Sequence, residues 1–497
     1  MKKLLIPSVF ALVLIAAFSV FAFTYENEIP ASEEFAVDSA YMKSENLALN
    51  ADCDSKKLVD GKADTSFRSL RKENFFVTLD LGKNQTINTA IIKEKGLNVK
   101  EFSISVSPDG EAFETVYKSD KIEYHRLCTF DEVDARYVRL TVTKSDSFPA
   151  IREIEVYNEP SRNTDDFRIT AYLADGDVNE ILADEKLTDE QKEEKLNQYF
   201  DDYDLKSLTH LFHYCGVSFD ETGAVFLGDS KENQADKENQ LRLLLKVLSE
   251  RMTPNAKISF VFGFNQGHSG RNSAMGDNRD VFIKNLIDFA KKFEFDGIDI
   301  DYEFPQTDED FRIFSDFLVA LKKEMQVQMG KDSLLSCAFG TRDLHYTEQA
   351  IKALDMVNIM TYDIMDQDGQ HSSFWSCTQQ ALAYAQEVGF EQSQVNLGIP
   401  FYGTQTDAIM EQYIYKNLPC TDYFQNTYMV NGYLDFSPTP VYFNSPALVR
   451  DKTSFSLFNG CGIMVWSFTC DTAVDDENSL WKAVKDAVSQ FGGGLNE

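Results

Sequence analysis

Ten residues near the middle of the chain decide its fold: Asp296-Gly297-Ile298-Asp299-Ile300-Asp301-Tyr302-Glu303-Phe304-Pro305. Acidic and apolar residues alternate there, which is the period of a β-strand with one polar face. On such a strand Asp299, Asp301 and Glu303 point to the same face, each about 7 Å from the next. Like charges in a confined site raise one another's pKa, so we expect one of these carboxyl groups to hold a proton near neutral pH. A protonated Glu303, at the end of the strand, could act as a general acid.

A solvated acidic edge and a calcium-binding loop are the alternatives for this stretch. A calcium loop of the EF-hand kind needs a glycine at its sixth position and a glutamate at its twelfth. Neither residue follows here at that offset. The alternating apolar residues also favour a strand over a loop. The stretch alone leaves the acidic edge open, and the motifs elsewhere in the chain favour catalysis.

The composition argues against several classes of partner. With 48 Lys and Arg against 80 Asp and Glu, the chain of 497 residues has a net charge of −32. That field disfavours nucleic acid, anionic membrane surfaces and strongly sulfated glycans, whereas a neutral or cationic polymer is acceptable. The length exceeds that of one ordinary domain, so two or three domains are expected.

Residues 1–22 have the form of a secretory signal peptide. A charged start, an apolar stretch and the small-residue cleavage site Val20-Phe21-Ala22 follow one another, so we expect a secreted, extracellular or periplasmic protein. An uncleaved membrane anchor is the alternative, because the stretch is about long enough to span a bilayer. The cysteines are too sparse for a disulfide scaffold. Cys461 and Cys470 flank a predicted strand that holds them too far apart to form a disulfide.

The chain divides into two patterns joined by a polar connector at 158–166. Residues 35–159 predict a β-sandwich, because short alternating strands follow one another at 75–81, 86–93, 101–107, 137–143 and 153–157. Residues 165–492 alternate strands with helices such as 280–292 and 308–329. The eight apolar strands lie at 168–173, 209–214, 258–264, 297–303, 334–339, 356–362, 396–402 and 462–468. This alternation predicts a (β/α)₈ barrel, in which chemistry gathers at the carboxyl ends of the strands.

The sandwich segment resembles the discoidin or coagulation factor 5/8 C-type module, a jelly roll common among carbohydrate-binding modules. The likeness rests on three turns, at 59–65, 107–110 and 135–140. The resemblance implies sugar binding and a structural calcium ion, with Asp64, Thr65 and Glu153 at the ligand positions. A turn with exposed acidic residues and no calcium is the alternative. Phe67 stands where the family usually has Trp.

The barrel segment resembles glycoside hydrolase family 18, the chitinase family. Residues 296–303 are similar to its Asp-x-x-Asp-x-Asp-x-Glu signature, which begins with Asp296 and Gly297. Segments 355–363, 397–403 and 464–467 agree with further family motifs on the sixth, seventh and eighth strands. The third strand departs from the family, because Phe262-Gly263-Phe264-Asn265-Gln266-Gly267 stands where many members carry Ser-x-Gly-Gly.

This resemblance implies a retaining hydrolase that lacks an enzymic nucleophile and needs no cofactor. Glu303 would protonate the glycosidic oxygen while the 2-acetamido carbonyl of the substrate attacks the anomeric carbon. Asp301 would orient the acetamido group, and Asp299 would support Asp301 and share the proton. Tyr362 would donate a hydrogen bond to the acetamido oxygen. Asp363 would bind substrate hydroxyl or acetamide groups, and Trp466 would form an apolar floor under the sugar. Met360 has the same parity as Tyr362 on the predicted strand, so both are expected to project into the barrel mouth. Tyr402 is expected either to line the groove or to pack.

We therefore expect a monomeric chitinase that cleaves β-1,4 bonds between N-acetylglucosamine units of chitin or a related glycan. An endo-β-N-acetylglucosaminidase that acts on N-glycan cores is the alternative enzyme, and a non-catalytic lectin is the alternative from another class. Segment 404–459 predicts a helix and looks too short for an added lobe, which favours an open groove and internal cleavage. His371 follows the sixth strand and is expected at the surface.

Overall fold

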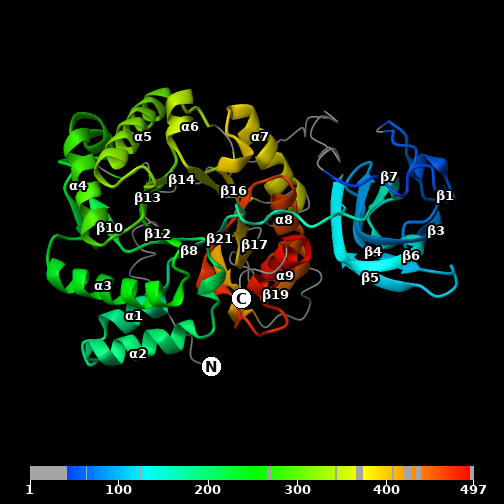
Figure 1. Ribbon diagram of the computed structural model, residues 1–497, viewed down its shortest axis with the longest axis horizontal. Coiled ribbons are helices and arrows are strands. Elements are labelled where there is room, and N and C mark those ends of the chain that lie inside the picture. The colour runs from blue at the N-terminus through cyan, green and yellow to red at the C-terminus, as the bar shows by residue number, and fades with distance from the viewer. Residues whose placement is uncertain are drawn as a thin grey trace.

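The computed structural model describes residues 42–62, 64–122, 125–265, 268, 270–341, 344–364, 373–405, 408–418, 427–431 and 438–492. In these residues a β-sandwich precedes a closed barrel, which confirms the predicted fold class (Figure 1). The predicted signal peptide lies outside the described residues. Within them, no helix has the length and apolar character needed to cross a membrane.

Two long bent strands hold the sandwich together. β3 (Phe75–Glu94) and β6 (His125–Ser145) pair along most of their length, with register shifts between Asp80 and Gln85 and between Ile87 and Thr89. The predicted strands 75–81 and 86–93 are two parts of the single strand β3, on either side of the register shift after Asp80. The full order is β2 (Phe67–Arg68), β7 (Ala150–Tyr157), β3, β6, β4 (Val99–Ser107) and β5 (Glu114–Ser119), with β1 (Asp52–Cys53) paired to β3.

Eight parallel strands close the barrel, and each coincides with a predicted strand. In spatial order they are β12 (Lys257–Asn265), β13 (Gly297–Glu303), β14 (Leu334–Phe339), β15 (Met356–Ile359), β16 (Val395–Pro400), β21 (Gly462–Trp466), β8 (Ile169–Leu173) and β9 (His210–His213). The short β15 leaves Met360 and Tyr362 just beyond its carboxyl end. A hairpin of β10 (Val217–Phe219) and β11 (Val225–Leu227) follows β9.

Helices surround the barrel with their apolar faces turned toward the strands. α5 (Asp308–Gln328) begins at a capping box in which the Thr307 and Asp310 side chains satisfy each other's backbone N–H groups. The others are α1 (Gly176–Ala183), α2 (Asp189–Phe200), α3 (Gln234–Arg251), α4 (Arg279–Lys292), α6 (Glu348–Ala353), α7 (Gln380–Val388), α8 (Pro446–Phe458) and α9 (Leu480–Gly492).

A small antiparallel sheet is inserted between the seventh and eighth barrel strands. Its order is β18 (Ala408–Ile414), β17 (Tyr402–Gln405), β20 (Pro438–Tyr442) and β19 (Thr427–Asn431). The expectation of a helix in segment 404–459 is met by α8, but this sheet was not foreseen. An open groove and internal cleavage stay predictions.

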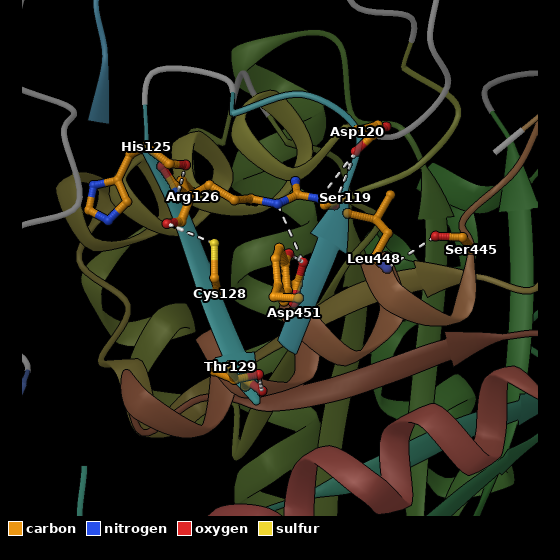
Figure 2. Close-up of polar contacts among 12 residues, drawn as sticks. Ser119, Asp120, His125, Arg126, Cys128, Thr129, Ser445, Leu448 and Asp451 are labelled. Atoms are coloured by element: carbon orange, nitrogen blue, oxygen red, sulfur yellow. Dashed lines mark hydrogen bonds and ion pairs between the residues drawn. The ribbon is translucent and has the colours of Figure 1, made fainter. Parts of the chain in front are cut away.

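The sandwich and the barrel share a buried contact along α8. β5 and β6 of the sandwich lie against this helix, and α8 and α9 are on the side of the barrel that faces the sandwich (Figure 1). Arg126, on β6, is 1% exposed and lies 3.3 Å from Asp451 of α8 and 3.2 Å from Asp120 (Figure 2). Tyr117 donates a hydrogen bond to Asp451. The sandwich is therefore held to the barrel by buried side-chain contacts as well as by the connector.

This contact buries α8 on nearly every side. Polar residues on the helix are as fully buried as apolar ones, namely Asp451, Lys452, Thr453, Ser454 and Ser456. The guanidinium of Arg126 also stands over the ring of Phe374, 5.0 Å from its centroid. Cys461 and Cys470 are both free thiols, in agreement with the prediction that they do not pair.

Candidate active site

Strand β13 presents its acidic side chains to the inside of the barrel. Its apolar residues Ile298, Ile300 and Tyr302 pack in the large core that strands and helices share. Asp299 and Asp301 point the opposite way and are 0% and 9% exposed. The predicted alternation of the two faces is therefore what the structure has.

The first residues of the motif fix the position of β13. The Asp296 carboxylate accepts hydrogen bonds from the backbone N–H of Ile258 (2.9 Å) and from Lys257 Nζ (3.0 Å). A Cβ on Gly297 would lie 2.5 Å from the carbonyl oxygen of Leu334 on the neighbouring strand. Asp296 and Gly297 thus hold three neighbouring strands in register.

Asp299 is surrounded by hydrogen-bond donors. Tyr172 donates to its Oδ2 (2.7 Å), Ser336 donates to its Oδ1, and Asn358 Nδ2 is 3.4 Å from Oδ1. Burial nevertheless raises the pKa of Asp299 to about 7, while the donors favour its charged form. Asp299 can therefore gain or release a proton near neutral pH.

Asp301 and Glu303 form a coupled pair in a largely buried setting. Tyr214 donates to Asp301 Oδ2, whereas Asp301 Oδ1 is buried without a hydrogen-bond partner among the described residues. Burial raises the pKa of Asp301. The charge of Asp301, followed by burial, holds the pKa of Glu303 well above its usual range. The proton of the pair therefore resides on Glu303 when Asp301 is ionised.

The sixth and seventh strands bring further polar groups to the same end of the barrel. Tyr402 donates to Asp363 Oδ1 at 2.5 Å. The nearest partner of the Tyr362 hydroxyl in the described residues is the sulfur of Met464, at 3.8 Å. A hydroxyl held only by a thioether is available to donate to a stronger acceptor.

Trp466 ends the eighth strand among aromatic rings. It is edge-on to Tyr172 at 5.6 Å and to Tyr214 at 5.5 Å between ring centroids. One apolar cluster inside the barrel contains the predicted residues Met360, Tyr362, Tyr402 and Trp466. Its buried members are Tyr172, Phe212, Val261, Met356, Tyr362, Tyr402 and Met464, with Tyr214, Leu334, Met360 and Trp466 packed against them. The predicted residues thus come together, although their roles stay predictions.

Sequence reasoning missed the groups that hold Asp299 and Asp301. Ser336 and Asn358 are single polar residues within apolar barrel strands, and that pattern could have pointed to them. Tyr172 and Tyr214 carried no such signal, because tyrosine is common in strands. His371 lies outside the described residues.

The side chains of the predicted calcium ligands Asp64, Thr65 and Glu153 have three different surroundings. Glu153 accepts the backbone N–H of Gly61 at 3.2 Å, and Thr65 donates to Asp60 at 3.0 Å, while Asp64 is exposed. Burial raises the pKa of Glu153 to about 7. The described residues contain no group of three or more His, Cys, Asp or Glu placed to hold a metal ion.

Comparison with known proteins identifies both parts of the chain. Residues 185–471 match the model of glycosyl hydrolases family 18, and residues 39–154 match that of the F5/8 type C domain. The Endochitinase of Manduca sexta is 25% identical over 230 residues, which are 41% of this chain and 41% of that protein. Chitinase A1 of Niallia circulans is 27% identical over 226 residues, 38% of this chain and 32% of that protein. The chain thus spans well under half of these relatives.

Among solved structures, a GH18 chitinase from Flavobacterium johnsoniae has a TM-score of 0.49 and 19% identity, covering 68% of this chain and 100% of that chain. The family-model match extends over more than half of the chain, includes β13 and its acidic row, and begins after the sandwich. The chain therefore belongs to glycosyl hydrolases family 18 and carries an F5/8 type C domain ahead of its barrel.

Proposed function

We propose that this protein is a chitinase that cleaves β-1,4 bonds between N-acetylglucosamine units with retention of configuration. One observation carries the proposal: Asp301 keeps a buried oxygen without a partner among the described residues, and the next acid of the row, Glu303, has a raised pKa. An ionised acceptor beside a protonated acid is what substrate-assisted hydrolysis requires.

In the first step, Glu303 transfers its proton to the glycosidic oxygen as the bond between that oxygen and the anomeric carbon breaks. The acetamido carbonyl oxygen of the same sugar bonds to the anomeric carbon, which gives an oxazolinium ion. Asp301 accepts the acetamido N–H through Oδ1, and the Tyr362 hydroxyl donates to the acetamido oxygen. Both contacts orient the nucleophile, and the negative charge of Asp301 offsets the positive charge that develops on the acetamido group.

In the second step, a water molecule attacks the anomeric carbon and gives a proton to the Glu303 carboxylate. The oxazolinium ring opens, and the product regains its acetamido group. Two inversions at one carbon amount to retention. Asp299, with a pKa of about 7, can hold a proton when Glu303 is deprotonated, which lowers the total negative charge of the row.

The choice of chitin rests on charge and on likeness. A net charge of −32 favours a neutral or cationic polymer over a polyanion. Several relatives of the barrel carry the name chitinase. We infer that the F5/8 type C domain holds the enzyme to a glycan surface, and that residues 1–22 direct export of a monomeric enzyme. A calcium ion in the 59–65 loop stays a prediction, which unfolding midpoints in EDTA and in calcium would test.

A Glu303→Gln variant tests the mechanism on soluble chitooligosaccharides. Loss of the general acid should lower turnover by about 10²–10⁴-fold. Glu309→Gln is the matched control, because Glu309 is an exposed glutamate paired with Arg312 on α5, and it should leave turnover unchanged. Unchanged turnover in Glu303→Gln would refute the assignment. Inversion in the products, read by NMR of the anomers, would refute acetamido participation.

The substrate class needs a separate comparison. Sugar release from chitin oligomers and from a high-mannose glycoprotein should be measured with the same enzyme preparation. We expect release from the oligomers. Release from the glycoprotein alone would reassign the protein as an endo-β-N-acetylglucosaminidase.

A further inference from the structure

The phenol of Tyr214 holds one oxygen of the central acid of the row. Tyr214 follows β9, and its backbone N–H donates to the carbonyl of Leu173 at 3.0 Å. Its hydroxyl donates to Asp301 Oδ2. Its ring stands edge-on to Trp466 at 5.5 Å and is tilted against Tyr172 at 5.8 Å. The backbone and two rings thus fix the direction in which the hydroxyl points.

Room for this phenol exists because the strand between Tyr214 and Asp301 carries a glycine. Gly263 pairs with Asp301 in the ladder between β12 and β13. A Cβ on Gly263 would lie 3.4 Å from Cε1 of Tyr214 and 3.5 Å from Asp301 Oδ2. A methyl group would therefore already be in contact with both groups, and a longer side chain would displace the phenol.

The hydrogen bond from Tyr214 makes the two carboxylate oxygens of Asp301 different from each other. Oδ2 is occupied by Tyr214, which leaves Oδ1 as the oxygen without a partner among the described residues. While the phenol stays in place, Oδ1 is the oxygen left open to a hydrogen bond from Glu303 or from a substrate N–H. The carboxylate of Asp301 is in this way oriented before substrate binds.

We propose that Tyr214 is a positioning residue, which keeps Asp301 ionised and turns Oδ1 toward its reaction partners while Glu303 carries the proton. This inference rests on the proposed hydrolase function of the acidic row. A donor to the charged form of a carboxyl group stabilises that form. Burial raises the pKa of Asp301, and the Tyr214 hydroxyl opposes this rise.

In the described part of the chain, the titratable groups that interact most strongly with Asp301 are acids, phenols and a thiol rather than cations. They include Asp299 and Glu303 on its own strand, and Tyr172, Tyr214, Cys337 and Tyr362 on or just beyond the surrounding strands. Like charge on Asp299 disfavours ionisation of Asp301, whereas Glu303 lowers the pKa of Asp301. The phenol of Tyr214 is therefore the group whose removal should most change the sharing of the proton.

A Tyr214→Phe variant tests this role, because it removes the hydroxyl and keeps the ring against Trp466. The pH profile of kcat/KM on chitooligosaccharides should have its acid limb moved up by about one pH unit or more. At pH 5, kcat should fall by about tenfold, with a smaller change at pH 8. A profile that keeps its acid limb, or that falls equally at every pH, would overturn the proposal.

Tyr157→Phe is the matched control. Its hydroxyl donates to Glu155 Oε2 at 2.7 Å in the F5/8 type C domain, so it loses a phenol-to-carboxylate hydrogen bond outside the barrel. Its pH profile should match that of the unaltered enzyme. A shifted profile in this control would mean that any such loss perturbs the assay, and the proposal would fall.

A second measurement does not depend on activity. Asp301 has a folded pKa above its unfolded value, so stability that it contributes at low pH is lost as the pH rises through the folded pKa. Removing the hydroxyl raises that pKa further, so Tyr214→Phe should lower the unfolding midpoint more at pH 8 than at pH 5. An equal loss at both would leave Tyr214 as a packing residue and overturn the proposal. Absence of hydrolysis in the unaltered enzyme, with the pH-dependent loss still present, would refute only the proposed function.

Discussion

At the scale of single residues, three carboxyl groups on one strand have three different environments. Donors surround Asp299 on both oxygens, one donor reaches Asp301, and Glu303 lies next to the charge of Asp301. Different environments separate the pKa values of otherwise similar acids, which is how one row of carboxyl groups supplies both an acid and an anion.

Asp299 should make the stability of the barrel depend on pH. Its pKa is about 7 in the folded protein, above the usual value, so the stability it contributes is present at low pH and is lost as the pH rises through 7. Asp299→Asn removes this titration. We expect the unfolding midpoint of the variant to change less between pH 5 and 9 than that of the unaltered protein. Parallel curves for the two proteins would contradict this assignment.

The sequence was sufficient to place the acids but not their partners. Alternation in residues 297–303 sets which side chains share a face, because a strand has a period of two residues. The donors Tyr172 and Tyr214 reach the acids from strands more than 80 positions away in the chain. That contact depends on the register between β8, β9, β12 and β13, which no local pattern encodes.

At the scale of elements, Gly297 shows how closely the barrel strands approach. A Cβ there would lie 2.5 Å from the Leu334 carbonyl oxygen and 2.6 Å from Ser259 Oγ, so Gly297→Ala must push strands apart. We expect a loss of about 1–3 kcal/mol in the free energy of unfolding, measured by denaturant titration. Gly176→Ala, in the first turn of α1 with no atom within 4 Å of the added Cβ, is the control and should be neutral or slightly stabilising.

The buried cation Arg126, which contacts α8 from β6, should contribute more to stability than a partly exposed cation on the same strand. Arg126→Met removes the guanidinium that pairs with Asp451 and Asp120 in a buried contact (Figure 2), and breaking such a pair costs about 3–5 kcal/mol. Arg136→Met, also on β6, removes a partly exposed ion pair with Asp80 and should cost less than about 1 kcal/mol. Denaturant titration of both variants measures the two losses, and equal losses would contradict the buried arrangement.

The polar side of α8 could not be interpreted from sequence. Residues such as Asp451 and Ser454 on a helix normally indicate a face in contact with water. Here the sandwich covers that face of α8, and polar groups of the sandwich pair with those of the helix. A local pattern carries no information on a domain that docks from elsewhere in the chain.

At the scale of the whole molecule, the sandwich and the barrel should unfold as one unit. A barrel fragment beginning near residue 160 would expose the polar and apolar surface of α8 that β5 and β6 now cover. We expect the fragment to unfold at a lower temperature than the full chain and to bind more of a hydrophobic dye. Equal unfolding temperatures for the fragment and for the barrel in the full chain would show that the contact contributes nothing.

The fold of each domain could be predicted from the sequence. The arrangement of the two domains relative to each other could not. Eight apolar strands separated by helices were enough to predict the barrel, and short alternating strands were enough for the sandwich. The inserted sheet between β16 and β21 was missed, since 404–459 contains few of the apolar alternations that mark a strand. The docking of the two domains depends on single long-range contacts such as that between Arg126 and Asp451.

The burial of α8 from two sides limits how the domains can be exchanged. A sandwich put in place of this one would have to supply counterparts to Arg126 and Tyr117, because Asp451 would otherwise be buried without them. A substitution in α8 must in turn be compatible with packing against both the barrel and the sandwich. The sandwich of this protein is therefore not a portable domain, and grafting it onto another protein would require the outer face of this helix to be grafted with it.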